Sequence, residues 1–302
     1  MMLYRTINCL FFIVLSLASF GQSTISFTFD DGNLYPQADH TLEEWNNMIL
    51  NSLDSAEVKA VFFVKTEGKA NEKGKYLLDS WNSRGHLIAN HTYSHPYFNS
   101  EKVSAADFQS ELLKADSLIS SYSQYTKLFR FPYLKEGNTT SKVDSIRQFL
   151  KTYGYQNGYV TIDASDWYID SRLTRRLRRE PNADLQAYKN FYLEHLFDRA
   201  TYYDELAFQL TGRRIKHTLL LHHNLAAAFF LDDLIKMFKQ KGWHVISADE
   251  AYKDPIYDLV PEHAGESLIW ALAKDSGLFE QLLRYPAEDS RYEKDRMDAL
   301  GL

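Results

Sequence analysis

Short apolar runs without strict alternation of polar residues recur along the chain and predict buried β-strands. We expect seven of them, at Thr24–Phe29, Lys59–Val64, His86–Asn90, Lys127–Phe131, Gly158–Ile162, His217–Leu221 and Trp243–Ser247. Strands that are covered on both faces of a sheet show this continuous apolar pattern, whereas half-exposed strands alternate. The pattern therefore predicts a parallel sheet that is enclosed by helices.

Longer segments with helical spacing of apolar residues lie between these runs. The predicted helices are Leu42–Ser55, Lys75–Arg84, Ala105–Tyr122, Ser141–Tyr153, Leu185–Leu210 and Leu231–Lys241. Thr41 and Glu44 have the spacing of a capping box before the first helix, and Gly242 can end the last one. About seven β/α repeats result, which predicts an α/β fold, either a parallel barrel or an open parallel sheet.

Two further segments extend this repeat. Residues 170–213 are long for one crossover, so we expect an inserted pair of helices beside the site, and residues 255–302 have the pattern of a helical tail. A chain of 302 residues with 45% hydrophobic content can bury one large core. We therefore expect a single domain over residues 23–302, preceded by a leader at 1–22.

The leader has the charged, apolar, small-residue order of a secretory signal. Arg5 precedes the apolar run Leu10–Leu17, which is shorter than the roughly 20 residues that span a bilayer. We expect cleavage near Gly21 or Gln22, a secreted or periplasmic protein and no stable membrane span afterwards; a retained anchor is the alternative. The only cysteine, Cys9, lies in this segment, so any metal in the mature chain must use His and carboxylate ligands.

The charge balance argues against a nucleic-acid partner. The formal net charge is −6, whereas nucleic-acid binding favours a basic face. One basic run, Arg172–Arg179, is the exception. We interpret it as a solvated helix face, with binding of an anionic polymer or lipid headgroups as the alternative.

Five motifs with polar residues lie at or just after the carboxyl ends of predicted strands. They are Thr28-Phe29-Asp30-Asp31-Gly32, His91-Thr92-Tyr93-Ser94-His95, Arg130-Phe131-Pro132-Tyr133, Asp163-Ala164-Ser165-Asp166-Trp167 and Leu220-Leu221-His222. The carboxyl ends of the strands are where α/β barrels gather their chemistry. We therefore expect these five segments to meet at one mouth of the barrel.

The first two motifs contain candidate metal ligands. Because Gly32 lets the chain turn, Asp30 and Asp31 can both face the mouth, one as a metal ligand and the other as a free base. His91 and His95 are spaced i, i+4 and would share one face of a helical turn. With Asp31 as third ligand they predict a catalytic site that keeps positions open for water and substrate.

The other motifs supply groups that orient and donate. A buried Arg130 beside an unliganded aspartate would hold it ionised, and the Tyr133 amide, next to Pro132, is a candidate donor to an oxyanion. His222 can protonate a leaving amine if a carboxylate keeps it charged. Asp166 is the candidate carboxylate, and Asp163 is the alternative.

The remaining side chains of these motifs would form walls. Leu220 shares the barrel-lining face of its strand with His222, and Trp167 adds apolar surface. The same alternation points His223 outward, and Asn224 can help to order the loop that follows.

At these residues the chain resembles the polysaccharide deacetylases of the NodB-homology type, carbohydrate esterase family 4, whose five motifs match the five segments. The resemblance implies a distorted (β/α) barrel and removal of N-acetyl groups from N-acetylglucosamine-containing poly- or oligosaccharides, such as peptidoglycan or chitin. It implies that Asp30 is the general base. It also implies that Asp31, His91 and His95 are the metal ligands, usually for Zn²⁺.

The resemblance assigns roles to the other motif residues as well. Arg130 would tune the base, His222 would be the general acid, and Asp166 would orient that imidazole. Leu220 and Trp167 would form the pocket for the acetyl methyl group. The chain departs from the family where His223 and Asn224 follow His222, since an acidic residue is frequent there, and in the long insertion at 170–213.

Three rival functions have different consequences. A glycosidase would use an aspartate pair, but adjacent Asp30 and Asp31 fit poorly, because inverting enzymes need carboxyl groups ~6.5–9.5 Å apart. A non-catalytic carbohydrate-binding protein on the same fold would bind glycans without releasing acetate. A metal-dependent amidohydrolase could act instead on a small non-sugar amide.

Overall fold

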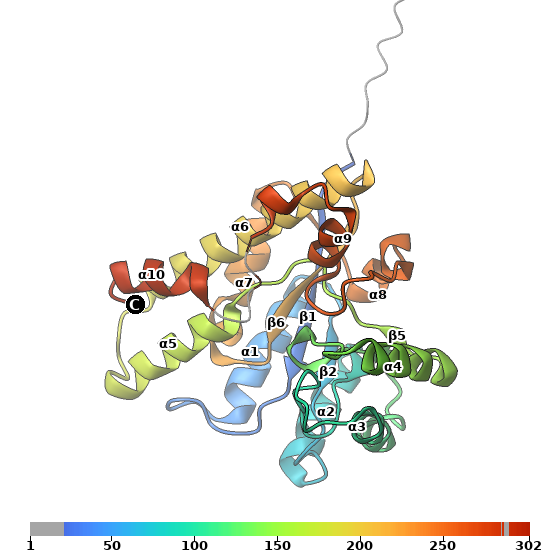
Figure 1. Ribbon diagram of the computed structural model, residues 1–302. Helices are drawn as coiled ribbons and strands as arrows, with labels where there is room; N and C mark the ends of the chain where they lie inside the picture. The colour runs from blue at the N-terminus through green and yellow to red at the C-terminus, as the bar shows by residue number, and fades with distance from the viewer. Residues whose placement is uncertain (1–20, 285, 287–289) are drawn as a thin grey trace, which may run out of the picture.

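The computed structural model describes residues 21–284, 286 and 290–302. The expected leader therefore lies outside the described residues, except for its last two positions. The described chain forms a parallel sheet with helices packed around it (Figure 1). None of the helices in these ranges is both long and apolar enough to cross a bilayer.

Seven parallel strands confirm the predicted barrel. They are β1 (Thr24–Asp31), β2 (Val61–Val64), β3 (Leu87–Asn90), β4 (Tyr125–Phe129), β5 (Gln156–Asn157), β6 (Lys216–His222) and β7 (His244–Val245). The order is β5-β4-β3-β2-β1-β6, and β7 pairs with the start of β1. β1 thus pairs with three strands, β2, β6 and β7, and its residues from Ile25 to Asp30 are buried.

Each of the six predicted helices overlaps an observed one, although α7 begins six residues before its predicted start at Leu231. They are α1 (Leu42–Ser55), α2 (Glu72–Ser83), α3 (Ala105–Ile119), α4 (Thr140–Tyr153), α5 (Asp166–Arg179), α6 (Gln186–Thr211), α7 (Leu225–Gln240), α8 (Ala248–Ala251), α9 (Leu268–Ser276) and α10 (Arg291–Ala299). Thr41 and Glu44 form the predicted capping box, in which each side chain bonds the other's backbone N–H. Gly242 follows α7 with a φ of 82°, as expected after the end of a helix.

The prediction of a strand at Gly158–Ile162 is wrong, because only Ile162 in that range makes a β-bridge. β5 ends at Asn157, where it pairs with β4, and Ile162 then forms a bridge to Leu219 of β6. At the change of partner Gly158 lies against the Phe63 ring, so closely that a Cβ atom there would be 2.4 Å from it. The chain therefore leaves one edge of the sheet and joins the other, which closes the barrel in a distorted form.

Two consecutive helices, α5 and α6, occupy the segment where we expect a helical pair. Leu173 and Leu177 of α5 are buried, whereas Arg175 and Arg179 are exposed. The tail is also helical, and α10 lies beside the outer half of α5 (Figure 1), where Arg172 contacts Asp298 at 2.7 Å. The basic run thus forms one outer face of α5.

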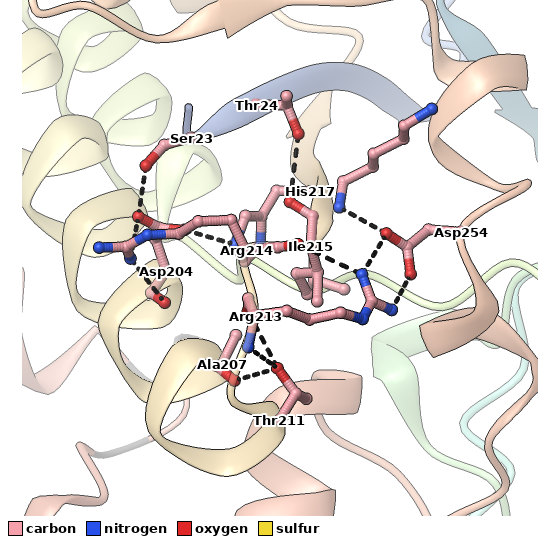
Figure 2. Close-up of polar contacts among 12 residues, drawn as sticks. Ser23, Thr24, Asp204, Ala207, Thr211, Arg213, Arg214, Ile215, His217 and Asp254 are labelled. Carbon is pink, nitrogen blue, oxygen red and sulfur yellow. Dashed lines mark hydrogen bonds and ion pairs between the residues drawn. The ribbon is translucent and has the colours of Figure 1, made fainter. Parts of the chain in front are cut away.

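Polar side chains hold the amino ends of β1 and β6 to α6 (Figure 2). Asp204 of α6 accepts hydrogen bonds from Ser23 Oγ at 2.6 Å and from Arg214 Nη1 at 2.7 Å. His217 Nε2 lies 3.3 Å from the same carboxylate. Because the Asp204 side chain is only 7% exposed, its loss would leave these partners poorly solvated.

We predict that Asp204→Ala lowers the free energy of unfolding by about 1.5–3 kcal/mol, the range for hydrogen bonds to a charged group. Denaturant titration followed by circular dichroism measures this change. The control is Glu205→Ala on the exposed side of the same helix, which should stay within about 0.5 kcal/mol of the wild type. Equal effects of the two substitutions would contradict a structural role for the Asp204 network.

Candidate active site

The five motifs meet at the carboxyl ends of the strands around one cavity of about 790 Å³. Two of the ten predicted site residues, Arg130 and Asp166, lie behind its wall, and each bonds a residue that lines it. The other eight line the cavity directly: Asp30, Asp31, His91, His95, Tyr133, Trp167, Leu220 and His222. The fold therefore brings together side chains that are up to 192 positions apart in the sequence, from Asp30 to His222.

Three of these residues form a group that could hold a metal ion. One ligand atom each from Asp31, His91 and His95 lies within 4.8 Å of the other two, and His95 Nε2 is 3.5 Å from Asp31 Oδ1. The Nδ1 of His91 lies 2.8 Å from the Arg130 carbonyl oxygen, which can only accept, so Nδ1 carries the proton and Nε2 is left bare. Burial lowers the pKa of His91 and of His95 to about 4, so both are neutral, as metal ligands must be. Two imidazoles and one carboxylate are a donor set that catalytic zinc sites use, and the group therefore fits that ion.

The prediction that His91 and His95 share a helical turn is wrong. Residues 91–95 form a loop, in which Thr92 has a φ of 67° and His95 a φ of 64°. Thr92 Oγ1 accepts from the His95 N–H at 3.1 Å, and buried Asn90 accepts from the Thr92 N–H at 2.9 Å. Side-chain hydrogen bonds to the backbone, rather than helical periodicity, bring the two imidazoles together.

Backbone in the left-handed region is concentrated around the cavity. Among the nine described non-glycine residues with positive φ, five belong to the motifs or adjoin them: Asp31, Thr92, His95, Tyr133 and Leu134. Such conformations cost about 1–3 kcal/mol each and persist where the surroundings enforce them, frequently at functional sites. At Asp31, with a φ of 81°, this turn brings the carboxylate to the same mouth as its neighbour Asp30.

Asp30 is paired with Arg130 in the interior. Arg130 Nη1 lies 2.5 Å from Asp30 Oδ1 and also donates to Thr28 Oγ1, while Nε donates to the Gly158 carbonyl. Both side chains are at most 4% exposed. Burial raises the pKa of Asp30, and the guanidinium opposes that rise by favouring the ionised form.

Tyr252 is a site residue that the sequence does not reveal. Its hydroxyl lies 3.0 Å from Arg130 Nη2 and donates to the Tyr159 carbonyl at 3.1 Å. Burial raises the pKa of Tyr252 to about 12, so the hydroxyl stays neutral. A lone tyrosine just beyond a four-residue helix carries no motif, and only the fold shows that it completes the surroundings of Arg130.

His222 is paired with Asp166, which lies at the start of α5. His222 Nδ1 is 2.7 Å from Asp166 Oδ1, and Asp166 Oδ2 accepts from the His222 N–H and from Asn224 Nδ2. Burial alone would lower the pKa of His222, but the carboxylates of Asp166, Asp31 and Asp30 together outweigh it, Asp166 most of all, and raise the pKa to about 10. Of the two carboxylates considered, Asp166 is thus the one that bonds the imidazole, whereas Asp163 lines the cavity.

Three neighbours complete the description of the motifs. His223 points away from the cavity, as the strand alternation predicts, and its Nε2 lies 3.0 Å from Asn46 Oδ1 of α1. The Tyr133 ring packs edge-on against His95 with 4.6 Å between centroids. Within the described chain no hydrogen bond occupies the Tyr133 N–H, whereas the N–H groups of Leu134 and Lys135 both donate within their turn.

We predict that His222 in chelator-treated protein titrates near pH 10, and that Asp166→Asn moves its pKa back toward or below the ordinary value of about 6.5. Because the folded pKa is above the unfolded one, the pair stabilises the fold fully below pH 6.5 and this stabilisation is lost as the pH rises through about 10. NMR of ring-labelled histidine measures both values. An unchanged His222 pKa in Asp166→Asn would show that this carboxylate does not hold the proton.

The fold and the site together are those of a barrel protein with a candidate metal group. The fold is a distorted parallel (β/α) barrel, and Asp31, His91 and His95 lie at the carboxyl ends of its strands. Residues 18–158 match the model of the polysaccharide deacetylase family. The match contains the first three motifs, from Asp30 to Tyr133. Just under half of the chain thus matches the polysaccharide deacetylases, the family that the five motifs resemble.

A relative in sequence is the peptidoglycan-N-acetylglucosamine deacetylase of Bacillus cereus, which is 32% identical over 115 residues. The matched segment spans 38% of this chain and 38% of that relative.

Solved structures of family 4 carbohydrate esterases share the fold. A pseudoenzyme of carbohydrate esterase family 4 from Bacillus anthracis has a TM-score of 0.51 at 18% identity, covering 76% of this chain and 66% of that chain. The Bc1960 peptidoglycan N-acetylglucosamine deacetylase, in complex with an N-hydroxybenzamide, has a TM-score of 0.50 at 21% identity, covering 77% of this chain and 89% of that chain. Since a pseudoenzyme shares the fold, activity has to be argued from the side chains of the site.

Proposed function

We propose that this chain is a metal-dependent hydrolase that removes N-acetyl groups from N-acetylglucosamine-containing poly- or oligosaccharides, peptidoglycan or chitin-like. One observation carries the proposal. A candidate metal group, a carboxylate held by Arg130 and an imidazole charged by Asp166 all face the same cavity. These are the three functions that hydrolysis of an unactivated amide requires: an electrophile, a base and an acid.

Asp31, His91 and His95 would hold the metal ion, and Zn²⁺ is the ion we propose. When bound, such an ion supplies polarisation of the acetamide carbonyl and a lower pKa for an attached water, from 15.7 toward ~7. With such an ion bound, the carbonyl oxygen would need no positively charged side chain to attract it. The Tyr133 N–H would donate to that oxygen as negative charge develops on it.

Asp30 would accept the proton of the attacking water. Its pairing with Arg130 keeps the carboxylate oriented and favours its ionised form, which a base requires. His222 would deliver a proton to the departing sugar nitrogen. Because Nδ1 is engaged with Asp166, Nε2 is the ring nitrogen that can donate to the substrate. The products are acetate and a free amino sugar, so the protons balance.

The rest of the cavity supports a sugar substrate. Leu220 and Trp167 would enclose the acetyl methyl group. A cavity of about 790 Å³ is far larger than an acetamide and within the range of pockets for larger ligands. This volume favours a glycan over a small non-sugar amide, and the complete set of chemical groups favours catalysis over carbohydrate binding alone.

We also propose that the protein acts outside the cytoplasm, in the envelope or beyond it, with residues 23–302 as the functional domain. The proposal is supported by the signal-like order of residues 1–22 and by a bacterial relative named for peptidoglycan.

The test of the activity is an acetate-release screen on N-acetylglucosamine oligomers and on peptidoglycan, with and without chelator. Acetate should be released without cleavage of the glycan chain, and release should stop on chelation and return with Zn²⁺. Chain cleavage would favour a glycosidase, and glycan binding without acetate from any substrate would favour a binding protein.

We predict that Asp30→Asn reduces turnover about 10²–10⁴-fold, the usual contribution of a general base, and leaves zinc stoichiometry unchanged. Acetate release and metal analysis measure the two effects separately. The control is Asp39→Asn, an exposed aspartate after the same strand that does not line the cavity. Normal rates in Asp30→Asn would refute its role as base.

We predict that His91→Ala weakens zinc binding at least about 100-fold and abolishes acetate release together with it, since a ligand matters at least as much as the groups that orient ligands. Competition with a zinc-sensitive dye measures the affinity. His244→Ala, at an exposed position of β7, should change neither quantity. Full deacetylation by zinc-free His91→Ala would exclude the proposed metal site.

A further inference from the structure

One wall of the candidate active site carries lysines that the proposed chemistry does not use. The loop between β2 and α2 places Lys65 and Lys69 along the cavity together with Glu67, and the first turn of α2 adds Lys73. The aromatic and apolar side chains of Tyr133, Trp167, Leu220 and Leu134 line other parts of it. The cavity is therefore chemically asymmetric, with a cationic part beside the candidate metal group.

Lys69 is the unusual member of this wall because it is nearly buried. It is only 7% exposed, and no ion pair or hydrogen bond of its ammonium group is found in the described part of the chain. Buried lysines are rare unless they are paired, since removing an ammonium group from water is costly. Burial, followed by the nearby charge of Lys65, lowers the pKa of Lys69 to about 8, so the group is still mostly protonated at neutral pH.

The backbone around Lys69 is tightly held. The Lys69 N–H donates to the Thr66 carbonyl at 3.0 Å, and Asn71 caps α2 through the Gly74 N–H at 2.9 Å. A Cβ atom at Gly74 would lie 2.3 Å from the Lys69 Cα, so only glycine fits against this turn. The Lys69 stem also packs beside Gly32, the residue that follows Asp31. The ammonium group is thus positioned by the fold.

The neighbouring charges leave Lys69 without a dedicated counter-ion. Glu67 lies 3.5 Å from Lys65, its partner in an ion pair, and Lys73 is exposed at the rim. Asp31 and, to a smaller extent, Glu67 favour the charged form of Lys69, but Glu67 is paired with Lys65 and, under the proposed function, Asp31 is committed to a metal ion. The ammonium group of Lys69 then has no ion-pair partner of its own among the described residues of the cavity wall, which matches a ligand with one negative charge.

We propose that Lys69 is the centre of an anion subsite that binds a carboxylate carried by the glycan, so that the substrate is an acidic N-acetylated glycan rather than a neutral one. This inference rests on the proposed function and specifies its substrate class. Lys69 acts as a specificity residue: it pairs with a group next to the reacting sugar and takes no part in the proton transfers. Lys65 and Lys73 add to the positive potential at the entrance.

The test compares two matched probes with the zinc-loaded full chain. One is a tetrasaccharide of alternating N-acetylglucosamine and N-acetylmuramic acid with free lactyl carboxylates, and the other is its methyl ester. The wild type should prefer the carboxylate in kcat/KM by about tenfold to a hundredfold, the worth of a hydrogen bond to a charged group. Lys69→Met should remove this preference mainly through KM for the carboxylate, and Lys69→Arg should retain most of it.

Lys75→Met is the control, because Lys75 is an exposed residue of α2 that does not line the cavity. It should keep the preference of the wild type. If Lys69→Met lowers kcat/KM equally for both probes, or leaves their ratio unchanged, the subsite is overturned and Lys69 has only a structural role.

Calorimetric binding of both probes to the Asp30→Asn variant separates this inference from the proposed function. If the wild type releases no acetate but Asp30→Asn binds the carboxylate more tightly than the ester, and Lys69→Met in that background abolishes the difference, the subsite stands and the proposed reaction fails. If neither turnover nor binding distinguishes the two probes, the subsite fails whatever the outcome of the acetate screen.

Discussion

The buried ion pair between Arg130 and Asp30 is the interaction on which the rest of the site depends. The guanidinium joins β1, the end of β4 and the turn at Gly158, and it lies 3.9 Å from the centre of the Phe63 ring. Removing one partner of a buried pair leaves an uncompensated charge and typically costs about 3–5 kcal/mol. The geometry of the carboxylate and the closure of the barrel are therefore maintained by the same side chain.

A second constraint is the concentration of strained backbone at the mouth. Asp31, Thr92 and His95 have positive φ values that most residues avoid, and the hydrogen bonds of Asn90 and Thr92 hold the second loop in place. The candidate ligands thus come from loops with fixed shapes. Preorganisation of this kind keeps donor atoms close together before an ion arrives, which limits the rearrangement that binding requires.

Much of this arrangement is readable in the sequence, because parallel strands place their carboxyl ends at one edge whatever the details between them. The capped helix at Leu42 follows from spacing and local chemistry, which also narrow the partner of His222 to Asp166 or Asp163. The loop around His91 does not, since an i, i+4 spacing is also compatible with a turn that side chains stabilise. The break at Gly158 and the contact of Tyr252 with Arg130 arise from tertiary packing, which leaves no periodic signal.

The β-bridge between Ile162 and Leu219 closes the barrel. A hydrogen bond between side chains joins the same two segments at the mouth of the barrel. Asp166 follows the segment that contains Ile162, and His222 ends β6, which contains Leu219. Their hydrogen bond therefore links the two segments that close the barrel. Hydrogen bonds between charged partners are about twice as strong as neutral ones. The bond between His222 and Asp166 is therefore strongest while the imidazole is protonated. Under the proposed function, transfer of the His222 proton to the leaving amine would therefore weaken this bond.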